Sequence, residues 1–164
     1  MKIKIKGIID GLYGLCINDV LINDCLADLS SISESFKSNE EITIEYSEGI
    51  TTIPNFRGTY QYEGNVELCP EVRHWFDLLK EKTTEIILPS SISDIEPFTF
   101  SGFKNLRIRG NKLPDKLLDI GDYAFSGCSE LVLFDVNPLL KGNNAFERCK
   151  LISFSDGQII SNNI

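Results

Sequence analysis

Residues 119–131 read Asp-Ile-Gly-Asp-Tyr-Ala-Phe-Ser-Gly-Cys-Ser-Glu-Leu, and residues 94–106 read Asp-Ile-Glu-Pro-Phe-Thr-Phe-Ser-Gly-Phe-Lys-Asn-Leu. When one stretch is shifted by 25 residues onto the other, the Asp-Ile pair, the Phe-Ser-Gly triplet and the final leucine coincide. Self-similarity at a fixed spacing of this size is typical of repeat proteins, in which each unit buries its apolar side chains by stacking on the next. The two stretches therefore predict a solenoid.

The repeat extends beyond these two copies. Each copy follows a Leu-Pro pair, at residues 88–89 and 113–114, and then two aliphatic residues three positions apart. These aliphatic pairs are Ile92 with Ile95, Leu117 with Ile120 and, in a fainter copy, Ile50 with Ile53. A shortened copy spans residues 144–151 and contains Phe146. The predicted unit is a short strand, a turn, two inward aliphatic residues and a helical or 3-10 turn that carries a phenylalanine inward.

This unit resembles the BspA-like, or bacterial surface antigen, type of leucine-rich repeat, which reads roughly Ile-Pro-x-x-Val-x-x-Ile-Gly-x-x-Ala-Phe-x-x-Cys-x-x-Leu. The likeness is strongest at 119–131, extends over 86–106, and is partial at 142–154 and faint at 29–56. The resemblance implies an α/β, β-rich leucine-rich repeat solenoid of short parallel strands joined by short helical or 3-10 turns. It also implies that the strands line one curved face that binds other proteins, and it implies no catalysis.

The length of 164 residues suits one domain. Residues 2–6 alternate charged and aliphatic side chains, and two Asn-Asp turn pairs follow between short aliphatic runs, so we expect residues 1–28 to form a β cap over the first repeat. Residues 29–56 are a degenerate repeat, residues 57–82 an insertion, and residues 83–159 the clear repeats. The expected domain is therefore a single leucine-rich repeat unit over 1–164.

The insertion is the least repetitive segment, and it contains a predicted amphipathic helix at 70–80. Pro70 suits the first helical turn, and four apolar residues fall on one face of the helix. These are Val72, Trp75, Phe76 and Leu79. Insertions in repeat proteins map to one side and often individualise binding, although this helix can equally pack back onto the repeats.

The net charge of −8 excludes nucleic acid and anionic membranes as partners, because both require a basic surface. A basic protein is the better electrostatic match, and the alternative is that the charge serves only solubility. The first residues alternate in polarity, Asp10 interrupts their apolar stretch, and no run reaches membrane-spanning length. We expect a cytoplasmic monomer, or an extracellular protein if the chain is part of a longer exported one.

The five cysteines show no Cys-x-x-Cys spacing, so the sequence predicts neither a zinc site nor a disulfide framework. Cys128 and Cys149 occupy the same place in successive repeats, three residues after the inward phenylalanine, and Phe103 takes that place in the copy before. We expect reduced thiols that fill space in the core, and the alternative is a stacked pair that oxidises in an exported protein.

Nothing in the sequence predicts an enzyme. His74 is the single histidine, and although Cys69 lies five residues before it, no third residue is singled out to orient a Cys-His pair. The chain has no Gly-x-Ser-x-Gly elbow, no Walker sequence, no dinucleotide fingerprint and no EF-hand spacing. We therefore expect no cofactor and no metal.

The remaining hypothesis is a protein-binding surface. The pleat of the strands predicts that Glu45, Ile87 and Asp135 point outward, together with two arginines that follow Leu106. Tyrosine, tryptophan and arginine carry much of the energy of protein interfaces, so the insertion supplies further candidates. The candidate binding residues are Arg57, Tyr60, Tyr62, Arg73, His74, Trp75, Arg107 and Arg109. An alternative function is a small acidic cytosolic inhibitor, of the immunity-protein or phage-antagonist kind, that blocks a basic enzyme.

Overall fold

A computed structural model describes residues 2–5, 20–22, 25–26, 41–53, 77–140 and 142–162. The described chain is rich in short strands and contains little helix. The strands are β1 (Lys2–Ile5), β2 (Val20–Ile22), β3 (Cys25–Leu26), β4 (Ile42–Tyr46), β5 (Thr52–Ile53), β6 (Thr83–Ile87), β7 (Asp94–Ile95), β8 (Arg107–Ile108), β9 (Asp119–Ile120), β10 (Val132–Val136), β11 (Leu151–Phe154) and β12 (Ile159–Ser161). A 3-10 turn, η2 (Arg109–Asn111), follows β8 directly, and residues 77–82 are helical.

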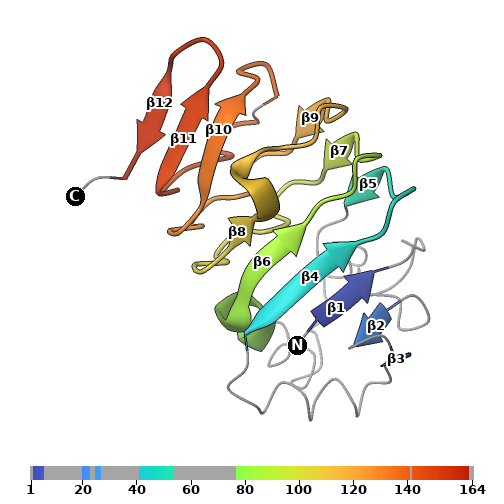
Figure 1. Cartoon of the computed structure of the whole chain (residues 1–164). Helices are drawn as coiled ribbons and strands as arrows, with labels where there is room; N and C mark the ends of the chain where they lie inside the picture. The colour runs from blue at the N-terminus through green and yellow to red at the C-terminus, as the bar shows by residue number, and fades with distance from the viewer. Residues whose placement is uncertain are drawn as a thin grey trace, which may run out of the picture.

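The strands follow one another in a stack from β3 to β12, as Figure 1 shows. Three sheets have the orders β3-β2-β1-β4-β6-β8, β5-β7-β9 and β10-β11-β12. Strands of successive repeats pair in parallel, whereas β2 and β3 at one end and β12 at the other pair antiparallel. The observed arrangement is a β-rich repeat fold whose repeats pair in register.

Alternation of apolar and polar residues decides which side of β4, β6 and β8 faces the core. Ile44, Ile86 and Ile108 are directly opposite one another in the ladder, and all three are buried. Their neighbours in β4 are half-buried, and Arg107 in β8 is exposed. Because side chains alternate across a strand, one face of this sheet enters the core and the other carries polar side chains.

The second ladder joins β5, β7 and β9. Ile53 pairs with Ile95, and Ile95 pairs with Ile120. The aliphatic residue three positions earlier is buried in each repeat as well; these residues are Ile50, Ile92 and Leu117. The prediction of inward aliphatic pairs three residues apart is confirmed.

A third ladder runs through the phenylalanine turns. The N–H groups of Phe98, Phe100 and Gly102 donate to the carbonyls of residues 122, 124 and 126 at 2.8–3.0 Å. The turn at residues 123–127 donates to the following turn in the same way, again at alternate residues. Consecutive repeats are therefore fastened by hydrogen bonds at the strands and at the turns.

The core contains the predicted column of phenylalanines. Phe100, Phe125 and Phe146 are buried, and their rings stack with centroids 5.4 and 5.7 Å apart. Cys128 and Cys149 form a second buried column, and Phe103 is buried at the preceding place. Each thiol donates to the carbonyl of the phenylalanine one repeat earlier at 3.2 Å. The predicted repeat register is thus confirmed for these residues.

The sheets bypass the segment between β5 and β6. β4 pairs directly with β6, and β5 with β7, although the paired residues are 42 positions apart in the sequence. The carboxylate of Glu48 accepts hydrogen bonds from the N–H and the hydroxyl of Ser90 across this junction, at 2.9 and 2.8 Å. The helical residues 77–82 end at β6, and Leu79 from this helix is buried in the core.

Candidate functional site

The outward side of β4, β6, β8 and β10 is the candidate binding surface, and we call it the strand face. Arg107 is exposed on β8, as predicted. Arg109 is exposed too, but it belongs to η2 and not to a strand. Asp135 is exposed on β10, as predicted. Glu45 and Ile87 are half-buried and thus less exposed than predicted, because neighbouring strands cover part of their side chains.

Ion pairs cross the strand face from β6 to β11. Arg109 donates to both carboxylate oxygens of Glu85, at 2.7 and 3.3 Å, and these hydrogen bonds raise the pKa of the guanidinium. Arg107 and Lys150 both approach Glu130, at 3.7 and 3.5 Å. Since these groups are solvent-exposed, the pairs add little to stability, and their effect is to fix a pattern of charge.

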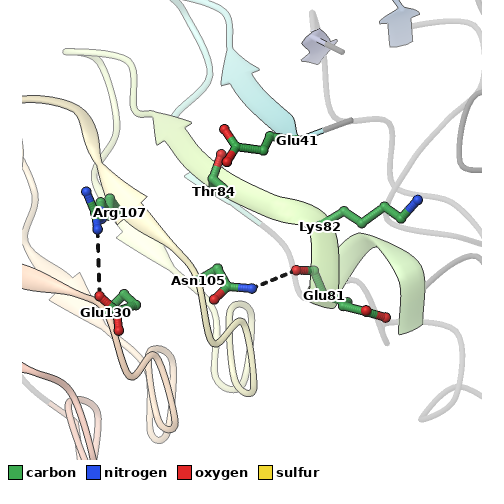
Figure 2. A pocket seen from close by; sticks show the side chains of 7 residues that line it. All are labelled: Glu41, Glu81, Lys82, Thr84, Asn105, Arg107 and Glu130. Carbon is green, nitrogen blue, oxygen red and sulfur yellow. Dashed lines mark hydrogen bonds and ion pairs between the residues drawn. The ribbon is translucent and has the colours of Figure 1, made fainter. Parts of the chain in front are cut away.

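A shallow groove of about 700 Å³ crosses the beginnings of the strands on this face. It is lined by Glu41, Glu81, Lys82, Thr84, Asn105, Arg107 and Glu130. Figure 2 shows Arg107 beside Glu130 on one side, Glu41 and Thr84 on another, and Asn105 beside Glu81 on a third. The Asn105 amide donates to the Glu81 carbonyl at 2.9 Å and so ties two successive repeats together. The groove offers both signs of charge and hydrogen-bonding groups.

Most of the groove was missed by sequence reasoning. Asn105 and Glu130 are 25 residues apart and both precede the inward leucine, so the repeat spacing already places them side by side. Glu81, Lys82 and Thr84 carried no signal, because they come from the junction between helix and β6. Glu41 is brought to them only by the pairing of β4 with β6.

The other candidate residues lie outside the described residues. They are Arg57, Tyr60, Tyr62, Arg73, His74 and Trp75. The helical residues 77–82 extend past the predicted end of the helix at residue 80, and Leu79 is buried as its apolar face required. Of the candidate binding residues, the structure therefore places Arg107 and Arg109 on the strand face. A binding role for the insertion residues stays a prediction.

The described residues carry no arrangement typical of catalysis. Burial raises the pKa of the Cys149 thiol to about 12, and it raises that of Cys128 well above its ordinary value. Both thiols are thus poor nucleophiles, because the thiolate is the reactive form. Within the described ranges, no three His, Cys, Asp or Glu residues are placed to hold a metal ion. No helix of this part of the chain is long and apolar enough to cross a membrane.

Comparison with known proteins agrees with the repeat geometry. A family model described as the BspA type leucine-rich repeat region, with six copies, matches residues 76–163. The match includes the helical residues 77–82 and covers the strands from β6 to β12. No curated protein and no solved structure matches the chain significantly.

Proposed function

Because the chain belongs to the BspA-type leucine-rich repeat family, we propose that it is a non-catalytic module that binds a protein partner through the strand face and the 57–82 segment. The strand face supports this proposal most directly. It presents an open groove with five charged side chains at or just before the first residues of β4, β6, β8 and β10, on a support formed by the repeat core. Residues on such a rigid support need little ordering when a partner binds, which favours affinity.

The proposal is tested by capture of partners from native cell extract. Arg107→Glu changes the charge on one side of the groove, and Lys116→Glu makes the same charge change at an exposed residue of the Pro114–Leu117 turn. We expect Arg107→Glu to release the captured partner and Lys116→Glu to retain it. If both variants capture the same partner with wild-type affinity, the strand face does not bind it.

The contribution of the insertion is tested separately. Replacing residues 59–67 with a short Gly/Ser linker removes Tyr60 and Tyr62 and leaves the described strands untouched. We expect weaker capture of the same partner. If the folded replacement binds with equal affinity, the strand face alone carries the binding.

A second candidate function is an acidic inhibitor of a basic enzyme, which the net charge of −8 favours. Attraction between a strongly acidic surface and a basic one is screened by salt. Such a complex would weaken steeply as ionic strength rises, so the salt dependence of the captured complex distinguishes the two functions.

A further inference from the structure

Two neighbouring repeats carry extra residues at the same place on the strand face. Two residues separate the buried Ile86 from the following proline, whereas five separate Ile108 from its proline and four separate Leu133 from its own. After Ile108 the extra chain forms η2, with Gly110 and Asn111 at φ 82° and 56°. In β10 it forms a bulge between Leu133 and Val136, with Asp135 at φ 57°. We call residues 109–111 and 134–135 the paired bulges.

The paired bulges interrupt the sheet. β6 pairs with β8 and β10 pairs with β11, but β8 and β10 belong to different sheets. The same two repeats remain joined through β7 and β9 and through the stacked Phe100 and Phe125. The separation is thus confined to the strand face, where η2 stands between β8 and β10 in Figure 1. Bulges of this kind re-aim side chains and are frequent beside functional sites.

Phe134 is the first residue of the second bulge, and it follows the buried Leu133 directly. It is 46% exposed, although a phenylalanine on a strand face would ordinarily be covered. Phe134 lies 25 residues after Arg109, the repeat spacing, so the two bulges present an aromatic ring and a guanidinium at equivalent places.

Ion pairs lie beside both bulges on the strand face. Lys112 contacts Asp135 at 3.5 Å, next to Phe134 in the sequence, and η2 itself is tied to β6 by the Arg109–Glu85 pair. The charged residues of the bulges and their ion-pair partners therefore comprise two basic and two acidic side chains. The charges at the bulges balance locally, on a protein whose net charge is −8.

We propose that the paired bulges are the anchor of the partner site, with Phe134 packing against apolar side chains of a protein segment that carries no large net charge. An exposed aromatic residue beside ion-paired side chains suits an interface hot spot, because such surroundings exclude water once a partner binds. The balanced charges argue against a strongly basic partner at this place, because its basic groups would meet Arg109 and Lys112 as well as Glu85 and Asp135. This inference rests on the proposed function and specifies its partner.

The probe is a peptide selected on the wild-type protein from a phage library of random dodecapeptides. Its affinity is then measured by fluorescence anisotropy for three variants. Phe134→Ser removes the anchor, Leu139→Ser removes an apolar residue that is 88% exposed outside the strand face, and Arg107→Glu tests the groove. Circular dichroism checks that each variant is folded, which we expect because all three side chains are exposed.

We expect the selected peptide to contain apolar residues, to bind Phe134→Ser at least about tenfold more weakly than wild type, and to bind Leu139→Ser normally. Its affinity should change by no more than about twofold between roughly 0.05 M and 0.5 M salt, because the site is neutral. Undiminished binding to Phe134→Ser with loss on Arg107→Glu overturns the anchor but keeps the strand face as the binding surface. Undiminished binding to both variants overturns the anchor and counts against the strand face as the binding surface, which leaves the 57–82 segment to carry the proposed function.

Discussion

Residues with positive φ recur at two fixed places in the three phenylalanine turns that the structure describes. Phe98, Tyr123 and Asn144 occupy the first place, with φ between 52° and 61°. The second place holds Gly102, Gly127 and Arg148, with φ between 61° and 82°. These two places bracket the turn, in which the N–H groups of alternate residues donate to the next repeat. The glycine of the Ser-Gly pair shared by residues 101–102 and 126–127 thus occupies a place with positive φ, and Arg148 adopts the same conformation in the third turn.

Gly121 is required for a different reason. A Cβ on this residue would lie 2.3 Å from the Pro97 nitrogen and 2.7 Å from neighbouring backbone carbons of the preceding repeat. Backbone cannot yield as a flexible side chain can, so we expect Gly121→Ala to separate the two repeats locally and to destabilise the protein by about 3 kcal/mol or more. Chemical denaturation measures this loss.

The matched control is Gly127→Ala. Its Cβ would find the nearest atoms at an ordinary 3.6 Å, and only the left-handed conformation, at φ 79°, opposes it. We expect a cost of about 1 kcal/mol. Equal losses for the two alanine variants would contradict the close approach at Gly121.

Phe125 is the middle ring of the phenylalanine column. Because it contacts rings on both sides, Phe125→Ala leaves a cavity that one neighbour cannot fill, and we expect a loss of about 3–5 kcal/mol. Phe134→Ala, at an exposed ring, should cost less than about 1 kcal/mol. A thermal melt of Phe125→Ala that matches wild type would show the stacked register to be wrong.

At the scale of the element, the phenylalanine turn was predictable and the paired bulges were not. The turn is specified by short-range identities, namely Phe-Ser-Gly and the leucine four residues later, and these survive a shift of 25 residues. Both of the copies that this shift compares contain a bulge, so aligning them shows no insertion. Only β6, which has a proline three residues after Ile86, reveals the excess.

The shortened copy at residues 144–151 also has a feature that the sequence pattern does not predict, namely its register. The spacing of 25 residues falls to 21 between Phe125 and Phe146 and to 19 between the paired strands, so Leu151 pairs with Val132 in the ladder instead of lying beside Leu131. The buried position is taken by Ile152, opposite Leu133. Loss of residues before a strand shifts its register without changing its apolar pattern, which explains why the pattern alone located this strand but not its partner residues.

The buried thiols of Cys128 and Cys149 predict that the stability of the fold depends on pH. The pKa of Cys149 rises from an ordinary 9.0 to about 12, and that of Cys128 also rises, because burial disfavours the thiolate. The unfolded chain loses these protons first, so the free energy of unfolding should fall as pH rises from about 9 to about 12. Denaturation at several pH values measures this slope, and Cys149→Ala should reduce it.

Reactivity of the thiols provides the corresponding control. At pH 8 a thiol reagent should leave Cys128 and Cys149 unmodified in the folded protein, and in denaturant without reductant it should titrate all five cysteines. Fewer than five thiols would indicate a disulfide. Rapid labelling of Cys149 in the folded protein would contradict its burial.

At the scale of the whole molecule, the repeat stack was predicted from local pattern and its direct continuation across the insertion was not. The faint pair Ile50 and Ile53 indicated a repeat before the insertion. Pairing of Ile53 with Ile95 depends on contacts between residues 42 positions apart, for which the intervening sequence provides no pattern. The groove on the strand face could not be predicted for the same reason, since it joins Glu41 to residues on the far side of the insertion.

Direct pairing of the repeats across the insertion allows the connecting chain to change in length. The entropy of closing a loop grows only with the logarithm of its length, so closing 42 residues instead of 25 costs roughly 0.5 kcal/mol more. The Glu48–Ser90 hydrogen bonds and the two parallel ladders hold the junction whatever the connecting chain contains. Leu79 apart, which is buried in the core, the length of the connecting chain is therefore nearly neutral for stability. Additions and deletions can accumulate there while the repeats on either side stay in register, so the binding proposed for this segment can diverge faster than the scaffold that supports it.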